Sequence, residues 1–158
     1  MLTVNKKILI NLKNLKLILF TLCLLFKFNA VQAALNISLK DYLDNKNIEN
    51  TSTQIYLLKR CSAVYAYASG IILKSDAITS KSFIEISNNL LFKSVELMVI
   101  EEEKKLEEAQ KKAEDNRKEL FNNYTIDGKK NWEKNNSHFK DSYISDDISI
   151  CSKLTEDK

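Results

Sequence analysis

Residues 59–74, KRCSAVYAYASGIILK, place thirteen uncharged residues in a row between two basic ends. One set of apolar side chains in and just before this stretch recurs at steps of three and four residues: Leu57, Leu58, Cys61, Tyr65, Ala68 and Ile72. That spacing is typical of one face of a helix. The chain has no proline and only two glycines, so little in its composition interrupts helices. We therefore expect an all-α fold built around a helix over about residues 53–74.

A second, longer helical pattern follows. Ser82 and Glu85 form an S-x-x-E helix start, and no proline or glycine interrupts the pattern up to Phe121. One apolar stripe runs through it: Ile84, Leu91, Val95, Met98, Leu106, Ala109, Ala113 and Leu120. The pattern predicts a single long helix over about residues 83–120, paired with the first as an antiparallel hairpin.

The second half of that long helix is highly charged. Residues 101–119 carry eight acids and six bases. Four pairs have the acid four residues before the base, the order that supports an exposed helix: Glu101–Lys105, Glu107–Lys111, Glu108–Lys112 and Glu114–Lys118. The segment reads either as a solvated face or as a projecting arm. In the second case its thin apolar seam is the candidate interaction surface: Leu106, Ala109, Ala113 and Leu120.

The flanking segments predict shorter elements. Ser38 with Asp41 predicts one or two helical turns, and Thr51 with Gln54 predicts the capping box of the first long helix. Near the C-terminus, Asp127-Gly128 is a turn signal, with Trp132, Phe139 and Tyr143 expected as apolar anchors. A short helix should open at Ser145-Asp146-Asp147 and bury one face: Ile144, Ile148, Cys151 and Leu154. Residues 34–154 then form one domain, and residues 155–158 a frayed tail.

The N-terminal 33 residues have the pattern of a secretory signal peptide. The basic start is followed by an apolar run, residues 17–26, and by the sequence VQA at residues 31–33. We expect cleavage after Ala33 and a periplasmic or secreted protein. An uncleaved anchor is the alternative, but ten apolar residues are fewer than the roughly 20 that span a bilayer.

Removal of the leader changes the charge balance. The whole chain has 24 basic and 21 acidic residues, a net charge of +3. The leader holds five lysines and no acid, so the exported chain carries 19 basic and 21 acidic residues, a net charge of −2. This mixed, nearly neutral composition gives no electrostatic case for nucleic acid as a partner. With the leader gone, no stretch is long and apolar enough for a stable membrane span.

Two cysteines, Cys61 and Cys151, remain in the exported chain. An even count in an oxidising compartment predicts a disulfide, here between the first long helix and the C-terminal helix. Two alternatives use the single histidine, His138. Cys61 and His138 could form a nucleophile and base, or both cysteines could bind zinc with His138 and one acid. No C-x-x-C or H-x-x-x-H spacing supports either alternative.

The sequence carries no phosphate-binding loop, dinucleotide-binding glycine pattern or serine-nucleophile motif. It resembles, as a group only, the small disulfide-containing helical proteins of bacterial periplasms. We expect a non-enzymatic interaction or chaperone-like module whose partner is another exported protein, with no cofactor and no metal. The alternative is a small-ligand-binding bundle with aromatic side chains around its pocket: Tyr65, Tyr67, Trp132 and Phe139. An interaction module requires an exposed apolar seam, whereas a binding bundle requires an enclosed aromatic cavity.

Overall fold

The computed structural model describes residues 37–156, and this part of the chain contains five helices and no strand. The helices are α2 (Leu39–Asp44), α3 (Thr51–Ile72), α4 (Ala77–Ile100), α5 (Leu106–Asn135) and α6 (Tyr143–Glu156). The expected all-α fold is therefore confirmed. The predicted signal peptide, residues 1–33, and the last two residues of the predicted tail lie outside the described residues.

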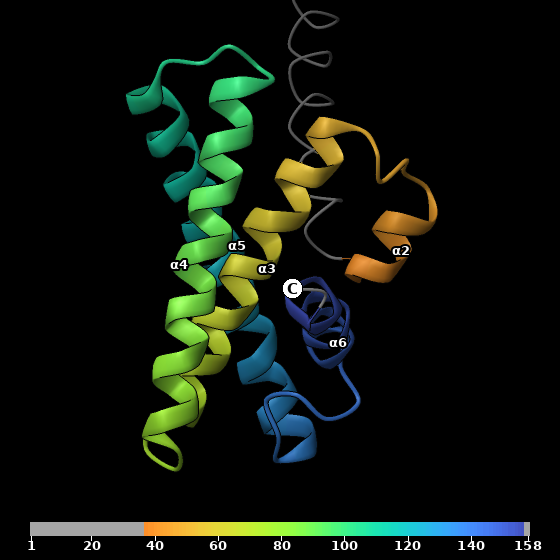
Figure 1. Ribbon diagram of the computed structural model, residues 1–158. Coiled ribbons are helices and arrows are strands. Elements are labelled where there is room, and N and C mark those ends of the chain that lie inside the picture. The colour runs from red at the N-terminus through yellow and green to blue at the C-terminus, as the bar shows by residue number, and fades with distance from the viewer. Residues whose placement is uncertain (1–36, 157–158) are drawn as a thin grey trace, which may run out of the picture. The chain divides into compact units, whose positions relative to one another are not determined.

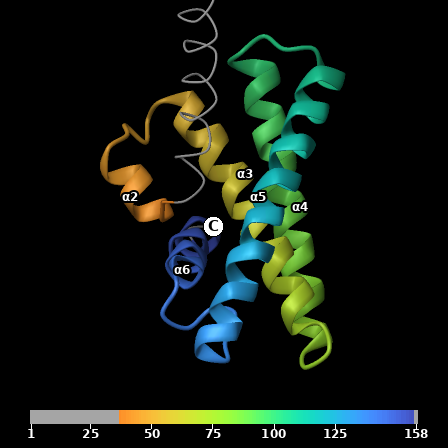
Figure 2. The ribbon, with the colours of Figure 1, turned by 180° about the vertical axis from the view of Figure 1, so that it is seen from behind.

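Helix α3 is the centre of the fold. Figures 1 and 2 show α4 and α5 on one side of it and α2 and α6 on the other. Thirteen of its 22 residues are buried, including the whole run from Lys59 to Tyr65. A helix buried around most of its circumference needs apolar or small residues on every face, as the uncharged stretch after Arg60 provides.

The packing of α3 against α4 is close and antiparallel. Ser62 and Ser87 exchange hydrogen bonds, each hydroxyl donating to the other's carbonyl oxygen at 2.7 Å. Ser69 and Ser80 repeat the arrangement at 2.8 and 3.0 Å, two turns further along. Small side chains allow the two backbones to approach, and the reciprocal bonds satisfy hydroxyls that would otherwise be buried without partners.

The predicted helix over residues 83–120 is wrong in two respects. The helix begins at Ala77, where the Asp76 carboxylate caps it by accepting a 2.9 Å hydrogen bond from the Thr79 backbone. It also ends at Ile100. The chain then turns through Glu103, whose φ of 52° is left-handed, and restarts as α5. Folding back lets Ala109 and Ala113 join a core cluster with Ile55, Val95 and Met98, which a straight helix would not allow.

Two further boundaries differ from the prediction. Asp127-Gly128 does not form a turn but lies inside α5, which continues to Asn135 and ends at the left-handed Asn136. Helix α6 begins at Tyr143 and runs to Glu156, so Thr155 of the predicted frayed tail is helical. The α3 cap is Asn50 in place of Thr51, whereas the predicted Ser38 cap of α2 is confirmed.

Candidate functional site

Helix α4 carries more large apolar side chains than are buried against its neighbours. The helix carries twelve large apolar side chains in 24 residues, distributed around its whole circumference. Only three of them, Leu90, Val95 and Met98, are buried. The other nine are half-buried or exposed: Ile78, Phe83, Ile84, Ile86, Leu91, Phe92, Leu97, Val99 and Ile100.

Several of these side chains stand largely in solvent. Ile78 is 86% exposed, Phe92 68% and Ile100 62%. A helix that is apolar all round is normally covered on all sides. Within residues 37–156, α3 and α5 are the helices that pack on α4. We call the surface turned away from both the outer face of α4; its residues are Ile78, Lys81, Glu85, Phe92 and Glu96. Asn88 accepts a hydrogen bond from Arg117 of α5, and Val99 packs against the core cluster, so both border α5.

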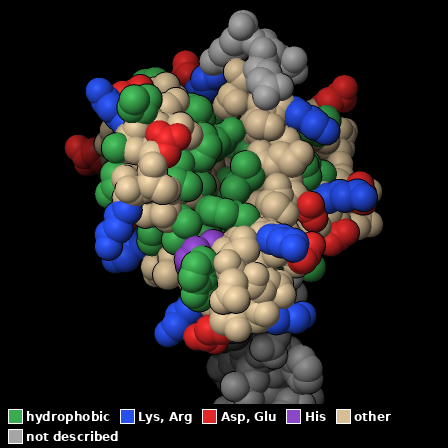
Figure 3. Space-filling model, turned by 90° about the horizontal axis from the view of Figure 1, so that it is seen from below, with side chains coloured by type: hydrophobic (Ala, Val, Ile, Leu, Met, Phe, Trp, Pro, Cys, Tyr) green, Lys and Arg blue, Asp and Glu red, His purple; other side chains and the backbone are tan. Residues whose placement is uncertain are grey.

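A second candidate is an aromatic cluster at the end of the bundle near the α5–α6 connection. The Tyr67 hydroxyl lies 2.9 Å from His138 Nδ1, and the His138 ring stacks on Trp132 with centroids 5.1 Å apart. Phe121 and Phe139 meet the Tyr67 ring edge-on. Burial raises the pKa of the Tyr67 hydroxyl to about 12. Figure 3 shows apolar side chains around a hollow at this end, with the histidine (purple) beside them.

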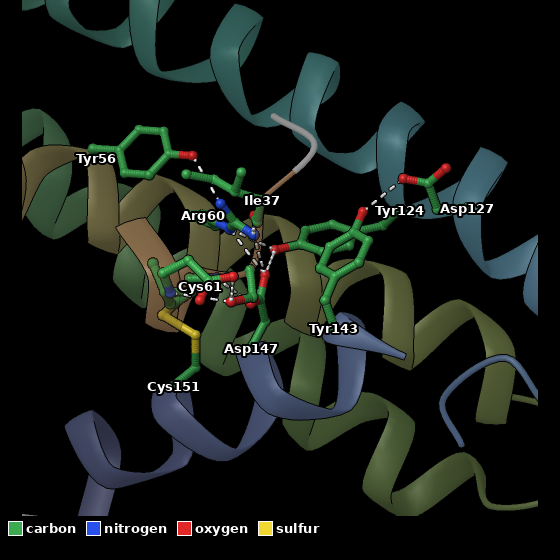
Figure 4. A network of polar contacts seen from close by, with 12 residues as sticks. Ile37, Tyr56, Arg60, Cys61, Tyr124, Asp127, Tyr143, Asp147 and Cys151 are labelled. Atoms are coloured by element: carbon green, nitrogen blue, oxygen red, sulfur yellow. Dashed lines mark hydrogen bonds and ion pairs between the residues drawn. A yellow bond between two sulfur atoms is a disulfide. The ribbon is translucent and has the colours of Figure 1, made fainter. Parts of the chain in front are cut away.

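The deepest polar group is a buried ion pair (Figure 4). Arg60 of α3 and Asp147 of α6 are 1% and 0% exposed, and the guanidinium donates to Asp147 Oδ2 from Nη2 at 2.7 Å and from Nε at 2.9 Å. The Tyr124 hydroxyl donates to the same oxygen at 2.6 Å, and the Leu39 backbone donates to Oδ1. Side chains of α3, α5 and α6 and the backbone of α2 therefore meet at one carboxylate.

Both charges of this pair are supported by their neighbours. Burial raises the pKa of the Asp147 carboxyl, while the Arg60 guanidinium and the donors around it oppose that rise. Burial alone would lower the pKa of Arg60, but Tyr124 and Asp147 reverse the effect and raise it. Arg60 also donates to the Tyr56 hydroxyl and to the Ile37 carbonyl oxygen. With so many partners inside the fold, the group is a structural centre that joins the helices.

The disulfide lies beside this centre. Cys61 and Cys151 are bonded to each other, both 0% exposed, with Cα atoms 5.4 Å apart. The predicted disulfide is therefore confirmed, and it joins α3 to α6 as expected. Because both sulfurs are in this bond, neither provides the free thiolate that the nucleophile and zinc alternatives require.

Lys59 is a further buried charge, one residue before Arg60. Its side chain is 7% exposed, and Nζ donates to Asn116 Oδ1 of α5 at 2.7 Å. Burial, with repulsion from Lys112, lowers the pKa of Lys59 to about 8, although Glu102 opposes the change. This amine is hydrogen-bonded within the fold and joins α3 to α5.

Of the four residues predicted as an interaction surface, one remains accessible. Leu106 is 55% exposed at the start of α5. Ala109 and Ala113 are fully buried and Leu120 is 5% exposed, so the predicted exposed seam is wrong at these three positions. They pack inward because α5 folds back along α4 and α3.

The four aromatic residues predicted to surround a pocket do not all lie at one place. Tyr67, Trp132 and Phe139 come together at the aromatic cluster, whereas Tyr65 is buried against Phe83 of α4. A small pocket of about 230 Å³ lies nearby, between the end of α5 and the start of α6. It is lined by Asp127, Lys130, Asn131, Lys134, Ser142, Tyr143 and Ile144, and contains none of the four predicted aromatics.

The residues of the buried ion pair were not singled out as a pair from the sequence. A signal does exist, because Asp147 lies three residues after Ile144 and four before Cys151, both on the apolar face of α6. An acid inside an apolar stripe needs a buried partner. Arg60, next to Cys61, is the corresponding base on α3, and the disulfide brings the two helices together.

Comparisons with protein-family models, curated proteins and solved structures found no match to this chain. Among the described helices, none is both long and apolar enough to cross a membrane. Residues 37–156 also contain no group of three His, Cys, Asp or Glu side chains placed to hold a metal ion.

Proposed function

We propose that the chain is a small exported helical protein that acts without catalysis, as a protein-interaction or chaperone-like module. The observation that supports this proposal is the outer face of α4 together with its flanks. Four large apolar side chains of this helix are exposed: Ile78, Ile84, Phe92 and Ile100. Exposed large apolar side chains repeated along one helix are a feature of protein-binding faces. The partner is another exported protein, and no catalytic group takes part.

The rest of the fold supports this role by holding α4 rigid. Reciprocal serine hydrogen bonds tie α4 to α3 at Ser62–Ser87 and at Ser69–Ser80. The disulfide and the Arg60–Asp147 pair tie α3 in turn to α6. A binding face on a rigid scaffold loses little conformational entropy when a partner binds.

The proposed face differs from the one predicted from the sequence. The apolar seam of α5 is buried in the core of the fold, except for Leu106, which is exposed. Leu106 is 55% exposed at the start of α5, and Ile100 is 62% exposed at the end of α4. The exposed seam required of an interaction module thus belongs chiefly to α4.

The small-ligand alternative has weaker support. The aromatic cluster contacts itself: the Tyr67 hydroxyl is bonded to His138, and His138 stacks on Trp132. The pocket beside Asp127 is about 230 Å³, below the roughly 300–1,000 Å³ of usual small-molecule sites. Export has independent support from the signal-peptide pattern and from the buried disulfide.

Photo-crosslinking in the cells that make the protein tests the proposal. A photoreactive phenylalanine analogue replaces Phe92, which is 68% exposed on α4. The matched control carries the analogue at Ile126, which is 54% exposed on α5 away from the outer face. Intact mass with the disulfide closed verifies that both variants fold.

We expect a discrete crosslinked adduct from position 92 and none from position 126. Adducts of equal yield from both positions would show only random encounters, and would overturn the proposal. No adduct from either position would overturn it as well.

A further inference from the structure

We propose that the α5–α6 connection is a pH-sensitive strap, closed against α3 while His138 is neutral and released from α3 when His138 gains a proton. The strap is residues 136–142, between the end of α5 and the start of α6. Two contacts hold it to Tyr67 of α3: the 2.9 Å hydrogen bond from His138 Nδ1 and the edge-on contact of the Phe139 ring. This inference goes beyond the proposed function and does not depend on it.

The direction of the Tyr67–His138 hydrogen bond determines what protonation does. Tyr67 is 3% exposed, and burial raises its pKa to about 12, so the hydroxyl keeps its proton near neutral pH. Within residues 37–156, His138 Nδ1 is the one hydrogen-bond partner of this hydroxyl, because its other side lies against the α5 backbone at Gly128. The hydroxyl therefore donates, and Nδ1 is the unprotonated nitrogen that accepts.

Protonation of His138 removes that acceptor. Both nitrogens of a protonated imidazole are donors. The Tyr67 oxygen could then accept from Nδ1, but its own proton would be buried with no acceptor. A buried donor without a partner carries the full cost of its desolvation. The closed strap is therefore less stable when His138 is charged than when it is neutral.

Stacking on Trp132 opposes release, because a cation is attracted to the face of an indole ring. Trp132 is 49% exposed, and this attraction is weaker at a solvated ring than at a buried one. The Tyr67 hydroxyl, in contrast, is buried. We therefore expect the loss of the Tyr67 bond to outweigh the attraction to Trp132.

No acid stabilises the charged form of His138. On α3 the titratable group that faces the ring is Tyr67, and on α5 the facing side chain is the uncharged Trp132. None of the ion pairs within residues 37–156 includes His138. The charged side chains nearest to it along α3, α5 and the strap are all exposed: Lys74, Glu133, Lys134, Lys140 and Asp141.

The backbone of the strap allows it to leave α3 while staying attached to α5. Asn136 and Asp141 have φ of 50° and 54°, a left-handed conformation that residues other than glycine adopt at a cost. Asn131 of α5 donates to the carbonyl oxygens of Ser137 and Lys140, both at 2.8 Å. These bonds do not involve α3, so they can persist when the strap opens. Opening uncovers aromatic rings at the hollow end of the bundle (Figure 3).

Nuclear magnetic resonance of the oxidised exported chain tests the inference. The chain has a single histidine, so the ring protons of His138 give one set of signals. We expect nuclear Overhauser cross-peaks from the Tyr67 ring to the His138 and Phe139 rings at about pH 7 and their loss at about pH 5, the range in which histidine gains its proton. The loss should have the same midpoint as the change in the His138 chemical shift. Cross-peaks that persist at pH 5, or that disappear at another midpoint, overturn the inference.

Two variants separate this hydrogen bond from other effects of acid, because carboxyl groups titrate in both as they do in the wild type. Tyr67→Phe has no hydroxyl to leave without an acceptor, so the cross-peaks from ring 67 should remain at pH 5. His138→Asn offers an amide oxygen near the place of Nδ1 and does not titrate, so the cross-peaks between Tyr67 and Phe139 should also remain.

Loss of these cross-peaks at pH 5 in either variant, after they are seen at pH 7, overturns the inference. Loss of the α3 and α4 amide signals of the wild type at pH 5 overturns it as well. That result would show acid unfolding of the whole bundle and not release of the strap.

Discussion

The Tyr67 ring packs directly against the backbone of α5 at Gly128. A β-carbon added at position 128 would clash with the hydroxyl oxygen and would lie 2.7 Å from Cζ and 3.3 Å from Cε1 of the ring. Gly128 has an ordinary helical conformation with negative φ, so the glycine is needed for space and not for backbone freedom. This close approach positions Tyr67 to reach His138 and fixes the α3–α5 spacing at the aromatic cluster.

Gly128→Ala should therefore destabilise the protein, although alanine is the better helix former. Alanine gains about 1 kcal/mol of helix propensity, but overpacking against the buried ring should cost about 1–3 kcal/mol. Chemical denaturation of the wild-type protein and of Gly128→Ala at pH 7 measures the net loss in free energy of unfolding. In a Tyr67→Ala background the same substitution should instead stabilise, because the ring is gone. Stabilisation in the wild-type background would show that the ring does not require the glycine.

Breaking the buried ion pair should be among the most damaging single changes. Asp147→Asn leaves the Arg60 guanidinium buried without its counter-charge, and should lower the free energy of unfolding by about 3–5 kcal/mol. The paired replacement Arg60→Met with Asp147→Leu removes both charges and should cost less than Asp147→Asn alone. The control is Asp115→Asn in the exposed Lys111–Asp115 pair, expected to stay within about 1 kcal/mol of wild type. A paired replacement that is less stable than Asp147→Asn would contradict this account.

The helical class, the central helix and the disulfide could be predicted from the sequence. The first two follow from the spacing of apolar residues, and the third follows from the number of cysteines. The residues of α3 repeat at helical spacing over six turns. Two cysteines allow one pairing. The acid inside the apolar face of α6 was the available signal for the buried ion pair, but the partner of Asp147 lies 87 residues away on another helix.

The break between α4 and α5 could not be predicted from local pattern. Residues 101–105 are acidic and basic residues of good helix propensity, and Glu103 adopts a left-handed backbone that such a residue disfavours by about 1–2 kcal/mol. The turn forms because it buries Ala109, Ala113 and Leu120 against the rest of the bundle. At Asp127-Gly128 the opposite error occurs, because a turn was predicted and the structure has a helix. Tertiary packing against Tyr67 places this turn-favouring dipeptide inside α5.

The disulfide should contribute strongly to stability and resist reduction in the folded state. It closes a loop of 90 residues, for which the chain-entropy treatment gives about 4–5 kcal/mol. Both sulfurs are fully buried, so a reductant can reach them only when the fold opens. Intact-mass analysis after alkylation should show two modified cysteines only when reductant and denaturant are combined. Rapid alkylation after reduction in native buffer would contradict the burial, and the Cys61→Ala, Cys151→Ala pair would then show whether the bond stabilises at all.

Because of Lys59, the free energy of unfolding should increase with pH on the alkaline side of neutrality. Its pKa is lowered to about 8 by burial first and by Lys112 second, while a lysine of the unfolded chain keeps its proton to about pH 10.5. Between pH 8 and pH 10 the unfolded state therefore binds more protons than the folded state, and the free energy of unfolding increases with pH. Above this window the effect is opposed, because the pKa of Tyr67 is raised to about 12 and ionised tyrosines favour the unfolded chain.

Lys59→Met should remove this pH dependence. At pH 7 the variant should be more stable than wild type by about 1–2 kcal/mol, less than the full shift implies because the Nζ group is hydrogen-bonded to Asn116 and partly screened. The two stability curves from urea denaturation should converge as the pH approaches 10. Lys118→Met, at an exposed position of α5, is the control and should run parallel to wild type. Curves for Lys59→Met that also run parallel would show that the buried amine keeps its proton throughout this range.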